Sequence, residues 1–112
     1  SLQTEFCQGD GEVLKKFNVK NLSNVIRTFS DTAAILYQLD LLITVDTSVA
    51  HLGGAIGKPT WLLLSKSPAW MWVKDEPRFL WYQSIKYIRQ KKSGNWSDVF
   101  KIVTNDLTEY FF

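Results

Sequence analysis

Residues 41–64 read LLITVDTSVAHLGGAIGKPTWLLL, and this stretch decides the fold. Residues 41–45 and 60–64 are short, continuous apolar runs, which are typical of strands covered on both faces of a sheet. Residues 49–56 are predicted to form a helix between them, which Gly57 and Pro59 end. The 14 residues that separate the two runs are too many for a hairpin and suit a crossover. We therefore expect the two strands to be parallel.

Three polar residues, Asp46, Thr47 and Ser48, follow the first of these strands, and each is a good helix N-cap. Ligands of open parallel sheets bind at the carboxyl ends of the strands. There the N–H groups of Ser48, Val49 and Ala50 are expected to be unpaired, and the helix dipole favours an anion. The turn therefore predicts a phosphate or pyrophosphate site. The hydroxyls of Thr47 and Ser48 would donate to phosphate, while Asp46 would cap the helix or accept from sugar hydroxyls. The alternative is that the turn only caps a helix.

The predicted helix contains Gly53 and Gly54 in succession, each of which costs about 1 kcal/mol relative to alanine. Packing must therefore hold the helix together. Helical spacing places Ala50 and Gly54 on a flank small enough for close approach to the sheet or to a ligand. The expected apolar face consists of Val49, Leu52 and Ile56.

His51 lies opposite Val49 on this helix and is therefore not expected in the core. Its ring can reach back over the preceding turn, where it would orient Asp46 or meet a phosphate. The equally weighted alternative is an exposed residue with no role in a site.

The other expected elements surround this central stretch. Ser30, Asp31 and Thr32 cap the helix predicted after the β-rich residues 25–29, and Ser30 and Asp31 either only cap it or also bind a ribose. The expected elements are strands at 25–29 and 85–89 and helices at 12–17, 33–39 and 96–107, the last capped by Asn95 or Ser97. Together they predict a single α/β domain over residues 1–112, a three-layer, Rossmann-like, doubly wound parallel sheet.

Composition limits the classes of function. A chain of 112 residues with 46% hydrophobic residues is typical of one globular domain. One Cys and one His exclude an internal disulfide, a zinc knuckle and a multi-His metal site, and leave a carboxylate-only magnesium site open. Since no apolar run reaches 18 residues, we expect a soluble, cytoplasmic protein without a transmembrane segment.

The charge is uneven. Residues 66–101 carry eight Lys or Arg against three Asp or Glu, which favours an anionic partner or a solvated basic face. Aromatic and basic residues alternate there, and they would either stack a nucleobase or pack over the core. They are Trp70, Trp72, Trp81, Tyr82, Lys66, Lys74 and Arg78. A net charge of +2 is weakly basic for a nucleic-acid partner, which we do not expect.

Residues 41–52, with Gly57, Lys58 and Pro59, resemble the donor-site signature of glycosyltransferase family 9, the heptosyltransferase-like enzymes. They are also similar to the glycosyltransferase domains that follow tetratricopeptide repeats (TPR) in bacterial proteins. The resemblance spans roughly residues 1–107. Its further pieces are DTAA at 31–34, QLD at 38–40, Trp70, Trp72, WY at 81–82, IRQ at 88–90 and GNW at 94–96.

This resemblance implies the C-terminal nucleotide-sugar-binding half of a GT-B fold, and hence a fragment of a larger glycosyltransferase. Asp46 resembles the acidic residue near the donor sugar and pyrophosphate, and residues 47–49 resemble the phosphate-holding turn. Ser30 or Asp31 matches a ribose or base rim, for which Gln3 is a third candidate. Residues 1–3 resemble the end of a first strand.

The implied enzyme is an inverting, metal-independent transferase that binds a nucleotide-diphosphate sugar and needs no cofactor. Its catalytic base would come from the missing N-terminal acceptor domain. We therefore expect no catalytic residue in this chain and no transfer by the chain alone. The alternative is a non-catalytic interaction module with a degenerate donor site, whose basic aromatic segment meets a protein or a polyanion.

Overall fold

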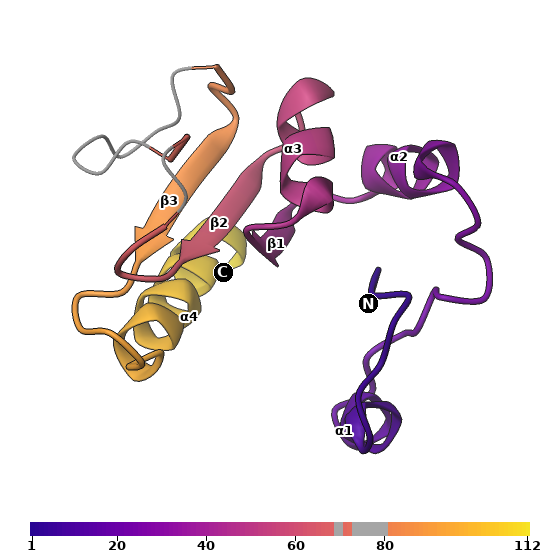
Figure 1. Ribbon diagram of the computed structural model, residues 1–112, viewed down its shortest axis with the longest axis horizontal. Coiled ribbons are helices and arrows are strands. Elements are labelled where there is room, and N and C mark those ends of the chain that lie inside the picture. Colours follow the sequence, from indigo (N-terminus) through magenta and orange to yellow (C-terminus); the bar gives the residue numbers. More distant parts are fainter. Residues whose placement is uncertain (69–70, 73–80) are drawn as a thin grey trace. The chain divides into compact units, whose positions relative to one another are not determined.

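A computed structural model describes residues 1–68, 71–72 and 81–112 (Figure 1). The chain divides into two compact units, an N-terminal unit, Ser1–Gln38, and a C-terminal unit, Leu39–Phe112. None of the helices formed by the described residues is long and apolar enough to cross a membrane.

The N-terminal unit contains two helices, α1 (Asp10–Lys16) and α2 (Phe29–Gln38). The predicted helix at 12–17 is thus confirmed with a shift of its ends, whereas the predicted strand at 25–29 is wrong. Residues 23–25 form a turn, and α2 already begins at Phe29. Residues 1–3, expected to end a strand, have no regular structure.

Reciprocal hydrogen bonds between Thr28 and Asp31 explain why α2 begins earlier than predicted. The carboxylate of Asp31 accepts from the N–H groups of Arg27 and Thr28 at 2.9 Å each, and Thr28 Oγ1 accepts from the Asp31 N–H at 3.4 Å. This is a capping box with Thr28 at the N-cap and Asp31 three residues later. Local capping therefore outweighs the β propensity of the preceding residues, and Ser30 and Asp31 lie inside the first turn rather than ahead of it.

The described residues of the C-terminal unit form a three-stranded parallel sheet with two helices. Its elements are β1 (Leu42–Val45), α3 (Ser48–Ala55), β2 (Thr60–Leu64), β3 (Ile85–Arg89) and α4 (Ser97–Phe111). The strands lie in the order β1-β2-β3 and all pair in parallel, with Leu42 opposite Thr60 and Thr60 opposite Ile85. The structure confirms the predicted parallel pairing and the expected α/β class.

The sheet separates two apolar clusters, so this unit has three layers (Figure 1). On one face Leu62 and Leu64 of β2 pack with Ala50 of α3. On the other face Trp61 and Leu63 pack with α4. The alternation along β2 follows from the period of two in a strand, and all five of its residues are buried.

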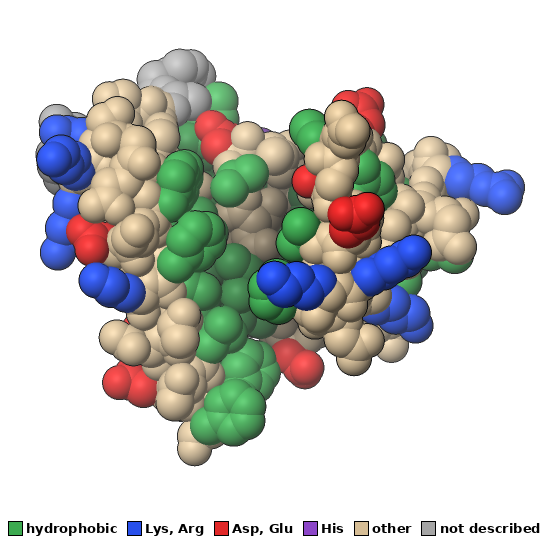
Figure 2. Space-filling model, turned by 90° about the horizontal axis from the view of Figure 1, so that it is seen from below, with side chains coloured by type: hydrophobic (Ala, Val, Ile, Leu, Met, Phe, Trp, Pro, Cys, Tyr) green, Lys and Arg blue, Asp and Glu red, His purple; other side chains and the backbone are tan. Residues whose placement is uncertain are grey.

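β1 departs from the expectation of burial on both faces. Ile43 and Val45, which belong to the face opposite α3, are 39% and 48% exposed. They are exposed because the cluster that packs with α4 on this face draws its strand residues from β2 and β3 and none from β1. Figure 2 shows one face of the molecule, on which hydrophobic side chains reach the surface.

α3 contacts the sheet through its small residues, which corrects the predicted helix face. Ala50, Gly53 and Gly54 are buried, whereas the residues expected in the core are only half-buried; these are Val49, Leu52 and Ile56. A Cβ on Gly53 would stand 2.8 Å from both Leu42 Cδ2 and Thr60 Oγ1. The helix backbone therefore lies too close to the sheet for larger side chains at these positions.

The end of α3 confirms the predicted glycine stop. Gly57 has a positive φ of 72°, which glycine adopts without steric cost. The Lys58 N–H donates to the Gly53 carbonyl at 2.9 Å, and the Gly57 N–H donates to the Gly54 carbonyl at 3.1 Å. This pair of bonds is a Schellman motif.

Candidate functional site

The turn between β1 and α3 lies where sequence reasoning expects a site. β1 ends at Val45 and α3 begins at Ser48, so Asp46 and Thr47 form the connection at the carboxyl edge of a parallel sheet. Asp46, Thr47 and Ser48 are all exposed, and Val49 is half-buried. A ligand can therefore reach the polar groups of this turn.

The backbone of the turn provides fewer free donors than expected. Thr47 is the N-cap of α3 in an extended conformation, with φ −140° and ψ 171°. The Ala50 N–H donates to the Thr47 carbonyl at 3.0 Å, so the prediction that it is unpaired is wrong. The first turn is tightened by this bond between residues three apart. Among the described residues, the N–H groups of Ser48 and Val49 have no acceptor.

The side chain at the N-cap position does not cap α3 either. No side-chain hydrogen bond caps α3 at Thr47, whose Oγ1 instead lies 3.5 Å from Thr44 Oγ1. Within the described part of the chain, the Asp46 carboxylate accepts no hydrogen bond, so its predicted capping role is not found. Two free amides and two hydroxyls can together hold an anion of several oxygens, with the helix dipole adding to the attraction.

His51 lies on the packed side of α3, against aromatic rings. Its ring centroid is 5.0 Å from that of Trp72 and 5.9 Å from that of Tyr82. The side chain is half-buried, so it is neither a fully exposed residue nor a core residue. The aromatic contacts on this side of the helix were missed by sequence reasoning, because Trp72 and Tyr82 are distant from His51 in the sequence.

The candidate rim residues Ser30, Asp31 and Gln3 belong to the N-terminal unit. The Asp31 carboxylate is occupied by the capping box, and the N–H groups of Arg27 and Thr28 lower its pKa below the ordinary 3.8. Gln3 Nε2 donates to the Glu5 carbonyl at 2.6 Å. Ordinary capping accounts for the Asp31 interactions, and a ribose-binding role for Ser30, Asp31 or Gln3 stays a prediction.

The aromatic segment divides between core and surface. Trp72 is 2% exposed and belongs to the core cluster on the α3 face, and Tyr82 packs beside that cluster. Of the two alternatives for the aromatic residues, packing over the core and stacking on a nucleobase, the structure favours core packing for Trp72 and Tyr82. Trp81 is 67% exposed. Trp70, Lys74 and Arg78 lie outside the described residues.

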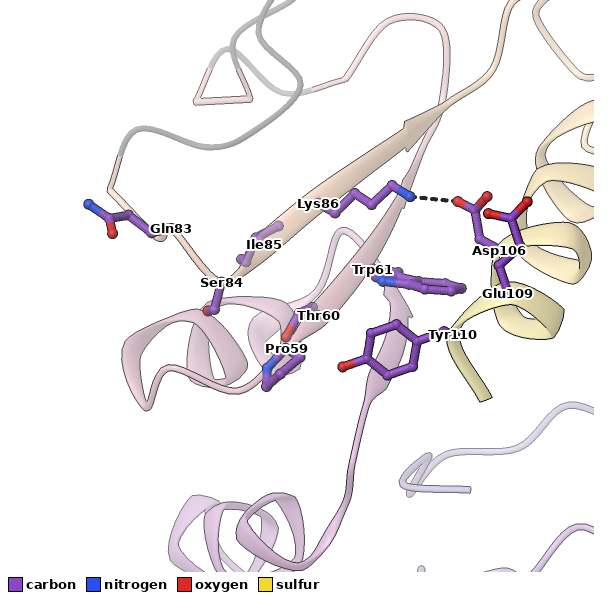
Figure 3. Close-up of a pocket in the computed structure, with 10 residues that line it drawn as sticks. All are labelled: Pro59, Thr60, Trp61, Gln83, Ser84, Ile85, Lys86, Asp106, Glu109 and Tyr110. Atoms are coloured by element: carbon purple, nitrogen blue, oxygen red, sulfur yellow. Dashed lines mark hydrogen bonds and ion pairs between the residues drawn. The ribbon is translucent and has the colours of Figure 1, made fainter. Parts of the chain in front are cut away.

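A cavity that sequence reasoning missed lies at the opposite edge of the sheet (Figure 3). Its volume is about 480 Å³, and it is formed where β2 and β3 begin, beside the last turns of α4. Its walls include Trp61, Lys86 and Tyr110. The sequence signal was weak, since these residues come from β2, β3 and α4, which come together only in the folded unit.

Comparisons with protein-family models, with curated proteins and with solved structures found no match for this chain.

Proposed function

We propose that the C-terminal unit binds the diphosphate of a nucleotide sugar at the turn between β1 and α3, as the donor-binding part of a glycosyltransferase. The observation that carries this proposal is a pair of backbone N–H groups, on exposed Ser48 and half-buried Val49, that have no acceptor among the described residues and lie at the carboxyl edge of the sheet. Backbone amides at a helix N-terminus are well suited to phosphate oxygens. The hydroxyls of Thr47 and Ser48 provide further donors.

The rest of the proposal follows from the family resemblance. Residues 41–59 are similar to the donor site of family 9 glycosyltransferases, and the parallel α/β architecture is compatible with a Rossmann-like half of a GT-B enzyme. In this proposal the Asp46 carboxylate accepts hydrogen bonds from the donor sugar. The catalytic base belongs to an acceptor domain outside residues 1–112, so this chain binds the donor without transferring the sugar.

Replacement of Ser48 separates the roles of its amide and its hydroxyl. Ser48→Pro removes both donors, and proline at the first helical position is tolerated. The extended Thr47 backbone is compatible with a following proline. Ser48→Ala removes the hydroxyl alone and is the matched control.

The experiment is a calorimetric titration of the intact chain and both variants with a panel of nucleoside diphosphates. We expect about tenfold weaker binding for Ser48→Ala, which loses one donor, and about a hundredfold or more for Ser48→Pro, which loses two, since each hydrogen bond to a charged group contributes about 1.5–3 kcal/mol. The unfolding temperature of each variant checks that the fold is retained. Equal affinity of Ser48→Pro and the unsubstituted chain would overturn the proposal, as would the absence of binding by any nucleoside diphosphate.

A further inference from the structure

The cavity at the amino edge of the sheet is lined in part by aromatic rings (Figure 3). Trp61 of β2 and Tyr110 of α4 meet edge to face, with ring centroids 6.0 Å apart and planes at 82°. Pro59 and Ile85 extend the apolar lining. Such a surface binds the apolar part of a ligand and, through the ring faces, a cation.

One cation already occupies part of this aromatic lining. Lys86 Nζ lies 5.3 Å from the centroid of the Trp61 ring and 2.6 Å from Asp106 Oδ2. Figure 3 shows the Lys86 side chain running along Trp61 to reach Asp106 on α4. The ion pair neutralises both partners, and it holds a positive charge over the face of the indole.

A second carboxylate leaves the lining with a net negative charge. Glu109 lies three residues after Asp106, and therefore on the same side of α4. Within the described part of the chain, Glu109 forms no ion pair. The cavity lining thus contains two carboxylates and one ammonium group.

The end of α4 adds a further negative potential. The lining residues Asp106, Glu109 and Tyr110 belong to the last turns of this helix, which ends at Phe111. The carbonyl end of a helix attracts cations, and the last turn of α4 contains no basic residue to satisfy it. The helix end and Glu109 therefore favour a positive charge at the same place.

A neutral polar group completes the lining. Ser84, the residue before β3, lines the cavity, and its Oγ is buried without a hydrogen-bond partner among the described residues. A buried hydroxyl in this state has the capacity to donate or accept one bond. It is a second polar group beside the cavity, separate from Glu109.

We infer that this cavity binds an organic cation, an ammonium or guanidinium group on a short apolar stem. The stem lies against Trp61 and Tyr110, the cationic head pairs with Glu109 and the end of α4, and Ser84 Oγ accepts or donates one hydrogen bond. The site lies at the opposite edge of the sheet from the proposed diphosphate site and does not depend on it.

Butylguanidinium is a suitable probe, and butylurea is its neutral control of the same shape. The intact chain, labelled with ¹⁵N, is titrated with each compound while the indole and backbone N–H signals are followed. We expect butylguanidinium to shift the Trp61 indole signal and the amides of the last turn of α4, and to bind about tenfold tighter than butylurea.

Two variants test the roles of individual side chains. Glu109→Gln and Tyr110→Leu are both at exposed positions, and each is expected to weaken butylguanidinium binding about threefold. Glu12→Gln, an exposed acid of α1, changes the net charge equally and should leave binding unaltered. Equal binding of butylurea, an effect of Glu12→Gln as large as that of Glu109→Gln, or shifts confined to other elements would overturn the inference.

Discussion

Gly54 and Tyr82 are in such close contact that a Cβ at position 54 would stand 2.4 Å from Cγ of the tyrosine ring. Gly54 lies in α3, and Tyr82 precedes β3. The same ring packs against His51, one turn earlier in the helix. The position of α3 over the sheet, and with it the turn proposed as the diphosphate site, therefore depends on the absence of a side chain at residue 54.

Gly54→Ala is predicted to destabilise the C-terminal unit. Alanine favours a helix interior by about 1 kcal/mol over glycine. Overpacking against the base of a tyrosine ring costs about 1–3 kcal/mol and should outweigh that gain. Denaturant unfolding measures the net change. Gly11→Ala in α1, where a Cβ would meet nothing within 4 Å, is the control and is expected to be neutral or stabilising.

Much of the sheet could be predicted from sequence because its signals are local. The apolar runs, the glycine stop at Gly57 and the 14-residue spacing each constrain one short segment. The strand at 25–29 was mispredicted because the Thr28 and Asp31 capping box competes with β propensity. The buried face of α3 was mispredicted because hydrophobicity ranks Val49 and Leu52 above glycine, although close packing requires the smaller residue.

Tyr87 is predicted to ionise at a higher pH than an ordinary tyrosine. Burial raises its pKa to about 12, against a smaller opposing effect of the Arg89 charge. Because the folded-state pKa is raised, its contribution to stability is complete below about pH 10 and is lost as the pH rises towards 12. In a pH titration followed by tyrosinate absorbance, one ionisation step should occur at a pH well above that of an ordinary tyrosine, and Tyr87→Phe should remove it. Four transitions at the ordinary pKa, in a chain still folded by circular dichroism, would contradict this.

Asp31 is predicted to stabilise α2 only while it is ionised. Backbone N–H donation from Arg27 and Thr28 lowers its pKa from 3.8. The stabilisation is therefore present above the unfolded-state pKa and is lost as the pH falls through the lowered folded-state value. Carboxyl ¹³C titration should give a lower pKa for Asp31 in the native chain than in concentrated urea. Thr28→Val, which keeps the Thr28 N–H, should retain most of this difference, whereas identical values in the two states would refute the capping role.

Asp46 is predicted to act on the sugar rather than on the phosphate. Its carboxylate is exposed and repels a neighbouring diphosphate, so Asp46→Asn should leave nucleoside diphosphate affinity unchanged or raise it. The same variant should weaken binding of the nucleotide sugar relative to the nucleoside diphosphate. Calorimetry with both ligands measures this ratio. A parallel loss of both affinities would show that Asp46 supports the turn itself.

The candidate site was only partly accessible to sequence reasoning. The position of Asp46, Thr47 and Ser48 after a strand followed from the residues alone. The pairing of the Ala50 N–H with Thr47 did not, because it depends on how tightly the first turn of α3 closes. The cavity beside Trp61 depends on side chains from distant elements, which no local pattern brings together.

The most direct test of the account is the response of the backbone amides to inorganic pyrophosphate. In ¹⁵N-labelled chain at neutral pH, the N–H signals of Ser48 and Val49 should move most, and Ser48→Pro should abolish the response at Val49. Lys91 and Lys92 belong to the basic stretch 66–101. If the signals of Ser48 and Val49 do not change while the amides around Lys91 and Lys92 move, the anion binds that basic stretch instead, and the diphosphate site proposed at the turn between β1 and α3 is wrong.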